Sequence, residues 1–195
     1  METFGIRNLL LVTMLIFGPV GCHAPPTDRF ENWREHRVGY SNIFLQLPPE
    51  YRPEDDEVQD RMRVQGAGCF ERDSRRVNTR GWRRVCARYV PPGSSGWATL
   101  RPDPRCTPEQ IPRTDCLMSE DFRSETMTLG GRLAHVERAV VSGGFANIKR
   151  QRQFRISLSL DEKTTLDLAG SVGDERGYAE MLEIASAVIS DEPAP

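Results

Sequence analysis

Strict alternation of apolar and polar residues near the C-terminus is the feature that most constrains the fold of this chain. The apolar positions are Phe154, Ile156, Leu158 and Leu160. A period of two is typical of a strand with one buried face. A polar turn over 161–164 then leads to Leu166 and Leu168. These positions predict an antiparallel hairpin.

Further strands are expected upstream. Ile43, Leu45 and Leu47 alternate before the Pro48-Pro49 stop, and we predict a strand there. Two more strands are expected over 61–70 and 82–90. Another hairpin, over 125–129 and 132–141, flanks Gly130-Gly131, a dipeptide that tolerates the positive backbone angles of a tight turn. The 16 Gly and 14 Pro favour many turns and a sheet-rich fold.

The period changes after Gly173, where apolar residues recur at helical spacing. The stripe consists of Tyr178, Met181, Leu182, Ala185, Val188 and Ile189. Asp174 and Glu175 suit the positive N-terminal end of a helix dipole, and Pro193 marks its end. We therefore predict an α+β fold, with a mainly antiparallel sheet of hairpins and a C-terminal amphipathic helix packed on it. A length of 195 residues fits one domain, over 37–195, and a tail.

The N-terminal segment has the composition of a signal peptide. Arg7 precedes an apolar run over 9–17. At 1.5 Å per residue this run reaches roughly 14 Å, about half of the ~30 Å hydrocarbon core, so residues 1–21 are interpreted as a secretory signal. Val20-Gly21-Cys22 resembles the lipobox of bacterial lipoproteins, which implies that Cys22 becomes a lipidated N-terminus. The alternative is an ordinary signal peptide with a Cys near the cut.

A lipidated Cys22 determines how the rest of the N-terminus is interpreted. Residues 22–36 are polar and contain Pro, and we expect a tether that lifts the domain off the bilayer. By analogy with lipoproteins, His23 in place of Asp favours the outer membrane, with the domain facing the periplasm.

Cysteine number also points to the envelope. Of five Cys, lipidation of Cys22 leaves an even set: Cys69, Cys86, Cys106 and Cys116. Disulfides suit an oxidising compartment. Cys69 and Cys86 flank a polar connection between two predicted strands, so we favour that pair, although the sequence leaves the connectivity open. Zinc is the rival interpretation, but no C-x2-C pair is present.

Metal and cofactor motifs are lacking in the sequence. The acidic stretch over 50–60 is expected to be a loop or short helix, and it has no alternating Asp ligands with a central Gly for calcium. There is no P-loop, HExxH or dinucleotide fingerprint, and 93–96 is not a nucleophile elbow. His135 and Glu137 share one strand face, so a general acid/base pair is conceivable beside a structural role for His135. We expect no metal, no cofactor and no catalysis.

The order of elements resembles the PsbP-like α/β sandwich, a fold common among small bacterial lipoproteins. The resemblance rests on GYSNIFLQLPPEY, residues 39–51, and on the run over 154–189. The cysteine-bearing middle, 69–116, departs from the family pattern. Proteins of this fold are mostly envelope factors, accessory subunits or periplasmic immunity proteins. The resemblance therefore implies a binding role.

A cluster of basic and aromatic residues is the candidate partner-binding surface. Nearly all of the 26 basic side chains are Arg. The guanidinium group of Arg forms two-point hydrogen bonds with carboxylates and phosphates, and Arg and Trp are enriched in interface hot spots. The cluster consists of Arg72, Arg75, Arg76, Arg80, Trp82, Arg83 and Arg84. The alternative is a solvated loop without a partner. A net charge of -2 makes nucleic acid an unsuitable partner.

Together these features predict a membrane-anchored envelope lipoprotein that acts as a non-catalytic protein-binding module. Its expected partners are the membrane, through the lipid on Cys22, and another envelope or secreted protein. The most specific hypothesis is an immunity-type inhibitor of a secreted toxin, with the Arg cluster and the loop between Cys106 and Cys116 as contacts. The alternatives are an envelope assembly or maintenance lipoprotein, and a hydrolase with an unrecognised site.

Overall fold

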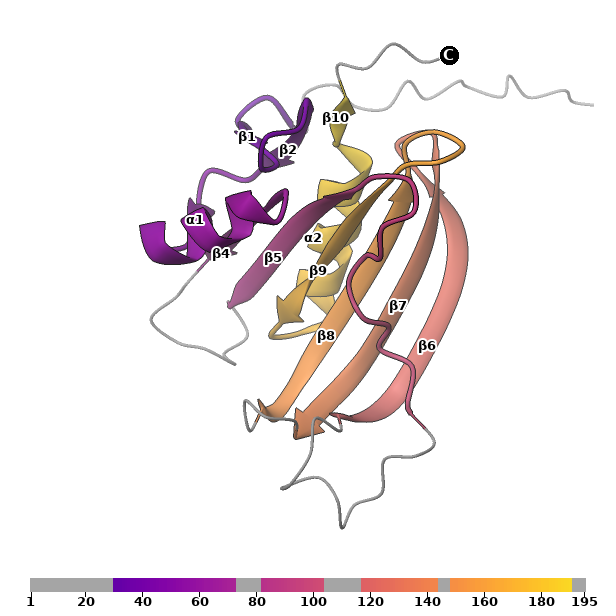
Figure 1. Cartoon of the computed structure of the whole chain (residues 1–195). Helices are drawn as coiled ribbons and strands as arrows, with labels where there is room; N and C mark the ends of the chain where they lie inside the picture. Colours follow the sequence, from indigo (N-terminus) through magenta and orange to yellow (C-terminus); the bar gives the residue numbers. More distant parts are fainter. Residues whose placement is uncertain (1–29, 73–81, 104–116, 144–147, 191–195) are drawn as a thin grey trace, which may run out of the picture.

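A seven-stranded antiparallel sheet forms the centre of the protein (Figure 1). The computed structural model describes residues 30–72, 82–103, 117–143 and 148–190. The predicted signal peptide, Cys22, Cys106 and Cys116 lie outside these residues. In sheet order the strands are β3 (Arg52–Pro53), β4 (Ala67–Arg72), β5 (Arg83–Val90), β9 (Thr165–Val172), β8 (Ile148–Ser159), β7 (Arg132–Gly143) and β6 (Leu117–Leu129).

The two predicted hairpins on the C-terminal side are confirmed. β8 pairs with β9 so that Leu158 lies opposite Leu166. β6 pairs with β7 across the Gly130-Gly131 turn, and both strands extend further than the sequence predicted. Alternation gives the sheet two different faces, because Phe154, Ile156 and Leu158 point to one side and the polar residues between them to the other.

The apolar face of the large sheet is covered by α2 (Glu175–Ser186), which contacts β2, β6, β8 and β9. Asp174 caps this helix by accepting a hydrogen bond from the Gly177 N–H, at 2.9 Å. Met181 and Ile184 lie on its fully buried side. The protein is thus an α+β sandwich in which most of the core lies between α2 and the sheet.

A second, smaller sheet contains β1 (Arg34–Arg37), β2 (Ile43–Leu47) and β10 (Ile189–Ser190). β1 includes residues 34–36, which the sequence analysis assigned to the tether. These residues pair with β2, whose alternate side chains are buried, so the folded domain begins before residue 37. Ile189 leaves the predicted helical stripe and pairs with Phe44.

The strand predicted over 61–70 is wrong in its first half. Residues 61–64 complete α1 (Asp56–Val64), and β4 starts at Ala67. Acidic Asp56 and Glu57 in the first turn and basic Arg61 and Arg63 in the last turn both favour the helix dipole. Gly66 separates helix and strand with a φ of +69°, a backbone angle that a glycine adopts without strain.

The polar face of the large sheet is crossed by the segment 91–103, hereafter the strap (Figure 1). The strap follows β5 and lies over β7, β8 and β9, while α1 packs on β4. Within the described part of the chain, no helix is long and apolar enough to cross a membrane.

Candidate functional site

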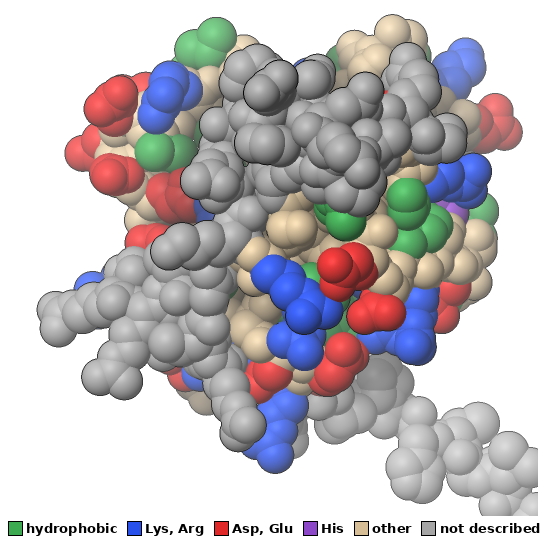
Figure 2. Space-filling view, turned by 90° about the horizontal axis from the view of Figure 1, so that it is seen from below, with side chains coloured by type: hydrophobic (Ala, Val, Ile, Leu, Met, Phe, Trp, Pro, Cys, Tyr) green, Lys and Arg blue, Asp and Glu red, His purple; other side chains and the backbone are tan. Residues whose placement is uncertain are grey.

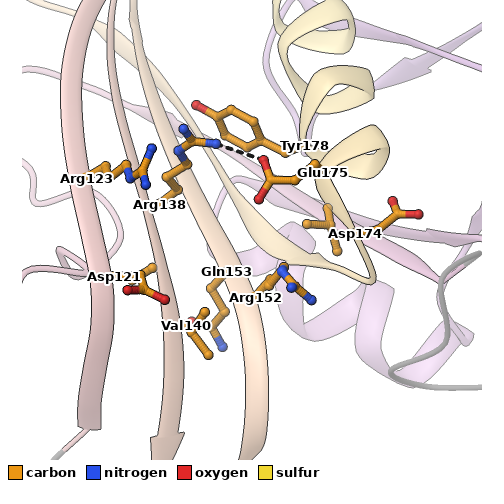
Figure 3. A pocket seen from close by; sticks show the side chains of 11 residues that line it. Asp121, Arg123, Arg138, Val140, Arg152, Gln153, Asp174, Glu175 and Tyr178 are labelled. Carbon is orange, nitrogen blue, oxygen red and sulfur yellow. Dashed lines mark hydrogen bonds and ion pairs between the residues drawn. The ribbon is translucent and has the colours of Figure 1, made fainter.

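An open cleft lies between β6, β7, β8 and the start of α2 (Figure 3). Its volume is about 410 Å³. Three strands and the helix contribute charged side chains of both signs, together with one phenol. The residues that matter for its chemistry are Asp121, Arg123, Arg138, Arg152, Glu175 and Tyr178. We call this site the arginine cleft.

Arg138 is the anchored member of the arginine cleft. Its Nη1 lies 3.0 Å from Oε2 of Glu175, and its guanidinium group stacks over the ring of Tyr178 at 4.7 Å from the centroid. Burial and the negative charge of Glu125 raise the pKa of Tyr178 to about 12, although Arg138 opposes this. The phenol therefore stays protonated at neutral pH, where it donates to Oε1 of Glu125.

Arg123 lies directly opposite Arg138 in the β6–β7 ladder. Like charges in such a position repel each other unless an anion lies between or beside them. Glu175 neutralises Arg138, but within the described residues the exposed guanidinium group of Arg123 has no ion pair. Arg152 is also exposed, and among the described residues its side chain donates only to the carbonyl of Gly173, at 3.3 Å. The arginine cleft is therefore able to accept a carboxylate or a phosphate.

Backbone geometry places Asp121 at the rim of the same cleft. The β6–β7 register shifts between Glu120 and Arg123, which is a β-bulge, and Asp121 has a φ of +53°. Few residues other than Gly adopt this left-handed conformation, and Asp is among those that tolerate it best. Bulges re-aim side chains at functional edges of sheets.

Four members of the predicted partner-binding cluster lie within the described residues, and two of them, Trp82 and Arg83, are buried. Arg75, Arg76 and Arg80 lie outside the described residues. Trp82 is 5% exposed and belongs to the buried residues. Arg83 is also buried, with Nη2 at 3.0 Å from Oδ1 of Asp174 and Nε at 3.8 Å from Oε2 of Glu180. Strand alternation turns Arg83 towards α2, where its charge is paired, and Trp82 is buried as well. Both side chains therefore support the fold.

The two other arginines of that cluster that the structure describes are also bound within the chain. Nη1 of Arg72 lies 3.3 Å from Oε2 of Glu180 on α2. Arg84 forms a two-point ion pair with Glu54. Their hydrogen-bonding groups are directed at carboxylates of this chain. The burial of Trp82 and Arg83 argues against a contact role for these two side chains, and the assignment of the cluster as a partner-binding surface stays a prediction.

The favoured disulfide is confirmed. Cys69 and Cys86 lie opposite each other on β4 and β5, and their sulfur atoms are bonded. Both cysteines are buried on the polar side of the sheet. Among the described residues there is no group of His, Cys, Asp and Glu that could hold a metal ion.

His135 and Glu137 lie close together, with Nε2 at 3.6 Å from Oε1. Glu137 is already engaged, since Oε1 accepts from the Thr99 hydroxyl at 2.7 Å and Oε2 accepts from the Leu100 N–H at 3.0 Å. Burial opposes ionisation, but these hydrogen bonds and the charge of Arg155 outweigh it and lower the pKa of Glu137. The carboxylate anchors the strap, and this argues against the general-base role considered for it.

Asp167 anchors the strap at a second point. It is almost fully buried, accepts from the Trp97 N–H at 2.9 Å, and lies 3.0 Å from Nη2 of Arg155. Gly96 passes so close that a Cβ there would lie 1.9 Å from Oδ2 of Asp167. Arg155 stands between the two carboxylates, with its Nη1 at 3.8 Å from Glu137.

Sequence reasoning missed the arginine cleft, although a signal was present. Arg138 has the same strand parity as the buried Ala134 and Val136, and Arg152 has that of the buried Phe154 and Ile156. A charged residue on the otherwise apolar side of a strand needs a partner or a solvent-filled space. The adjoining helix start, with Glu175 and Tyr178, completes the site from a distant part of the chain.

The charges on the end of the molecule seen in Figure 2 are mixed. Lys and Arg side chains alternate there with Asp and Glu rather than forming a patch of one sign. Such a distribution differs from the continuous basic stripe that favours nucleic acid.

No family model matches the sequence, and no curated protein matches it significantly. Among solved structures, the fold is similar to a cyanobacterial PsbP (CyanoP) from Synechocystis sp. PCC 6803, with a TM-score of 0.48, 10% identity, and coverage of 89% of this chain and 99% of that one. A PsbP-like fold is also what the order of elements in the sequence suggested.

Two further structures are similar at comparable coverage. One is LpqN, involved in cell envelope biogenesis of Mycobacterium tuberculosis, with a TM-score of 0.44, 14% identity, and coverage of 80% of this chain and 90% of that one. The other is the Saccharomyces cerevisiae Ran-binding protein Mog1p, with a TM-score of 0.44, 9% identity, and coverage of 82% and 95%. At these values the likenesses carry no argument about function, which has to come from the side chains of this chain.

Proposed function

We propose that this chain is a lipid-anchored protein of the bacterial cell envelope that binds another protein without catalysing a reaction. In its most specific form it is an immunity-type inhibitor that covers a secreted toxin entering the periplasm. The observation that carries the proposal is the arginine cleft, where Arg123 stands opposite Arg138 with no ion pair of its own among the described residues. A carboxylate on a partner is a group that can pair with Arg123.

The disulfide between Cys69 and Cys86 supports the proposed location. Disulfides form and persist in oxidising compartments and are rare in the cytosol. A lipid on Cys22 would attach the domain to the membrane, and the polar residues that follow it would leave the domain free in the periplasm. The outer membrane is the preferred location, because His23 and not Asp follows the lipidated Cys.

Rigid positioning supports binding to a protein surface. Arg123, Arg138 and Arg152 project from three neighbouring strands of one sheet, which is backed by the core and by α2. Arg is enriched at interface hot spots because its planar fork makes two-point contacts. Groups held by regular strands lose little further freedom on binding, so more of the contact energy appears as affinity.

The engaged state of Glu137 supports a non-catalytic role. A general base needs a free lone pair directed at the proton that it removes. Both Glu137 oxygens instead accept hydrogen bonds from the strap. In the arginine cleft, Glu175 pairs with Arg138, and Asp174 pairs with Arg83 while it caps α2. These carboxylates stabilise the fold, which leaves the cleft better suited to recognition than to acid/base chemistry.

The test is capture of partners by the mature domain without its lipid, from secreted proteins and from envelope extract. Three proteins are compared: the unaltered domain, Arg123→Glu, and Arg52→Glu as a matched control. Arg52 is also an exposed arginine and lies on β3, at the opposite end of the sheet. We expect one stoichiometric secreted partner that Arg123→Glu loses and Arg52→Glu retains. Trp82→Ala and Arg83→Ala are unsuitable controls because both side chains are buried.

The origin of the captured protein distinguishes the alternatives. A secreted partner predicts that deletion of the gene harms cells only when that partner is present. Recovery of resident envelope proteins alone favours an assembly or maintenance role. Equal capture by all three proteins would show that the arginine cleft is not the contact surface and would remove the observation on which the proposal rests.

A further inference from the structure

The two ends of the large sheet differ strongly. One end is β3, which has two residues, one of them Pro53, and a proline has no N–H to donate to a neighbouring strand. The other end is β6, with 13 residues. Within the described ranges, no strand pairs with the outer side of β6. Its outward N–H and C=O groups form a template on which another extended chain can pair.

The regular part of this edge is 123–129. The bulge interrupts β6 before Arg123, whereas from Arg123 to Leu129 every residue pairs in unbroken register with β7, from Arg138 to Arg132. Seven consecutive residues are a typical strand length. Most of these side chains are exposed, so this stretch is accessible from both faces.

Alternation assigns the side chains of this stretch to two sets. Arg123, Glu125 and Met127 lie on the side of α2, and Ser124, Thr126 and Thr128 lie on the other. Directly opposite residues of neighbouring antiparallel strands lie on the same face, with Cβ atoms about 4.5–5.5 Å apart. A residue of an added strand opposite Arg123 therefore lies beside Arg123, on the face of the sheet that carries the arginine cleft.

We propose that the partner adds an extended segment antiparallel to β6 along 123–129, with an Asp or Glu opposite Arg123. This inference rests on the proposed function and defines the chemistry of the partner. The segment carries a basic residue opposite Glu125 and an apolar residue opposite Met127, which packs against the core. Main-chain hydrogen bonds supply affinity, and the alternate side chains supply specificity, as in other cases of strand addition.

Charges on the edge favour a partner over a second copy of this chain. Two antiparallel copies of 123–129 paired over their full length place Arg123 opposite Leu129 and Glu125 opposite Met127, so neither charge has a complement. A register that sets Arg123 opposite Glu125 pairs only 123–125 before the bulge intervenes. Charges that reject the wrong strand while accepting the right one are a known means of specificity at sheet edges.

The experiment uses a designed peptide, Leu-Thr-Val-Thr-Lys-Thr-Glu, capped at both ends and added to the unlipidated mature chain. Its residues lie in antiparallel order opposite 129 to 123. Backbone hydrogen exchange is followed by NMR. We expect slower exchange of amides within 123–129 and about tenfold weaker binding to Arg123→Glu. A peptide ending in Lys instead of Glu should reverse this preference, while Arg52→Glu leaves both affinities unchanged.

Two N-methylated peptides separate strand addition from simple charge attraction. In an added strand, the backbone N–H groups of every second residue point towards β6, and those of the residues between them point to solvent. One peptide carries N-methyl groups on the first set, which blocks pairing, and the other carries them on the second set, which does not. Strand addition is supported if the peptide with methyl groups towards β6 loses binding and the other peptide retains it. Equal binding of the two methylated peptides, or no protection of 123–129 by the unmethylated peptide, overturns strand addition. Protection that grows with protein concentration in the absence of peptide points to a second copy and also overturns it.

The two proposals can fail separately. Capture of a partner that depends on Arg123, without protection of 123–129 by the peptide, removes strand addition and leaves the binding function intact. If the peptide protects 123–129 but no partner is captured, the edge of β6 is able to pair with an extended segment, and the proposed function is removed.

Discussion

Arg83 Nη2 lies 3.0 Å from Oδ1 of Asp174, and the same oxygen accepts the Gly177 N–H at the start of α2. One carboxylate thus joins β5 to the helix cap. The Arg83 side chain is only 7% exposed, so its charge is compensated inside the fold rather than by water. Glu180, one turn further along α2, lies near the same guanidinium group and also pairs with Arg72.

Arg83→Ala should lower the free energy of unfolding by about 3 kcal/mol, because removing one member of a buried ion pair leaves the other unpaired. Urea denaturation followed by circular dichroism measures the change. Arg52→Ala, at an exposed position, should change stability by no more than about 0.5 kcal/mol. A loss as small as that of Arg52→Ala would contradict the structural role assigned to Arg83.

Reduction of the Cys69–Cys86 bond should destabilise the domain. The two cysteines are 17 residues apart, and a cross-link closing a loop of about this length stabilises by about 3 kcal/mol, mainly by restricting the unfolded chain. The double variant Cys69→Ala, Cys86→Ala should therefore show a lower midpoint of thermal unfolding. A reducing agent should lower the midpoint of thermal unfolding less for this variant than for the native chain. An equal decrease would show that the Cys69–Cys86 bond is not the source of the stabilisation.

Acid should weaken the attachment of the strap. The pKa of Glu137 is lowered in the folded protein, below the ordinary value of 4.5. The unfolded chain therefore takes up this proton first as the pH falls. The contribution of Glu137 to stability is complete above the ordinary value and is lost as the pH falls through the lowered folded one. Glu137→Gln should reduce the slope of unfolding free energy against pH as the pH falls below the ordinary value of 4.5. Identical slopes would rule out this linkage.

Gly96→Ala should displace the strap from the sheet. A Cβ at this position meets Oδ2 of Asp167 at 1.9 Å, and Asp167 cannot retreat because it is buried and paired with Arg155. We expect faster amide exchange at Trp97 and Leu100 and a loss of about 2 kcal/mol. Ser95→Ala, an exposed neighbour in the same segment, serves as the control. Unchanged exchange at Trp97 would mean that the strap can accommodate the extra carbon.

Local patterns predicted much of the sheet. The alternation over 154–160, the Gly130-Gly131 turn and the Cys69–Cys86 bridge each depend on residues within one hairpin, and the structure contains all three. The prediction over 61–70 was wrong because a helix end and a strand start were merged. Gly66 is the boundary between them.

The candidate site was harder to predict because its parts are distant in sequence. Arg138 and Glu175 meet only when α2 packs on the sheet. A dense run of arginines at 72–84 attracted the partner-binding assignment, yet the described members of that run bind carboxylates on α2 and Glu54. Composition indicates that arginine is abundant, but only the fold decides which guanidinium groups are already occupied.

Pro53 and the two-residue length of β3 have a consequence for stoichiometry. The large sheet can be extended at β6 but not at its opposite end, so a strand added to this sheet has no equivalent second site to fill. Each molecule is then monovalent in this mode, and an encounter ends in a one-to-one complex rather than in a growing fibre. On the proposed membrane anchor, where neighbouring copies would meet often, such a limit would keep the molecules separate until the proposed partner binds.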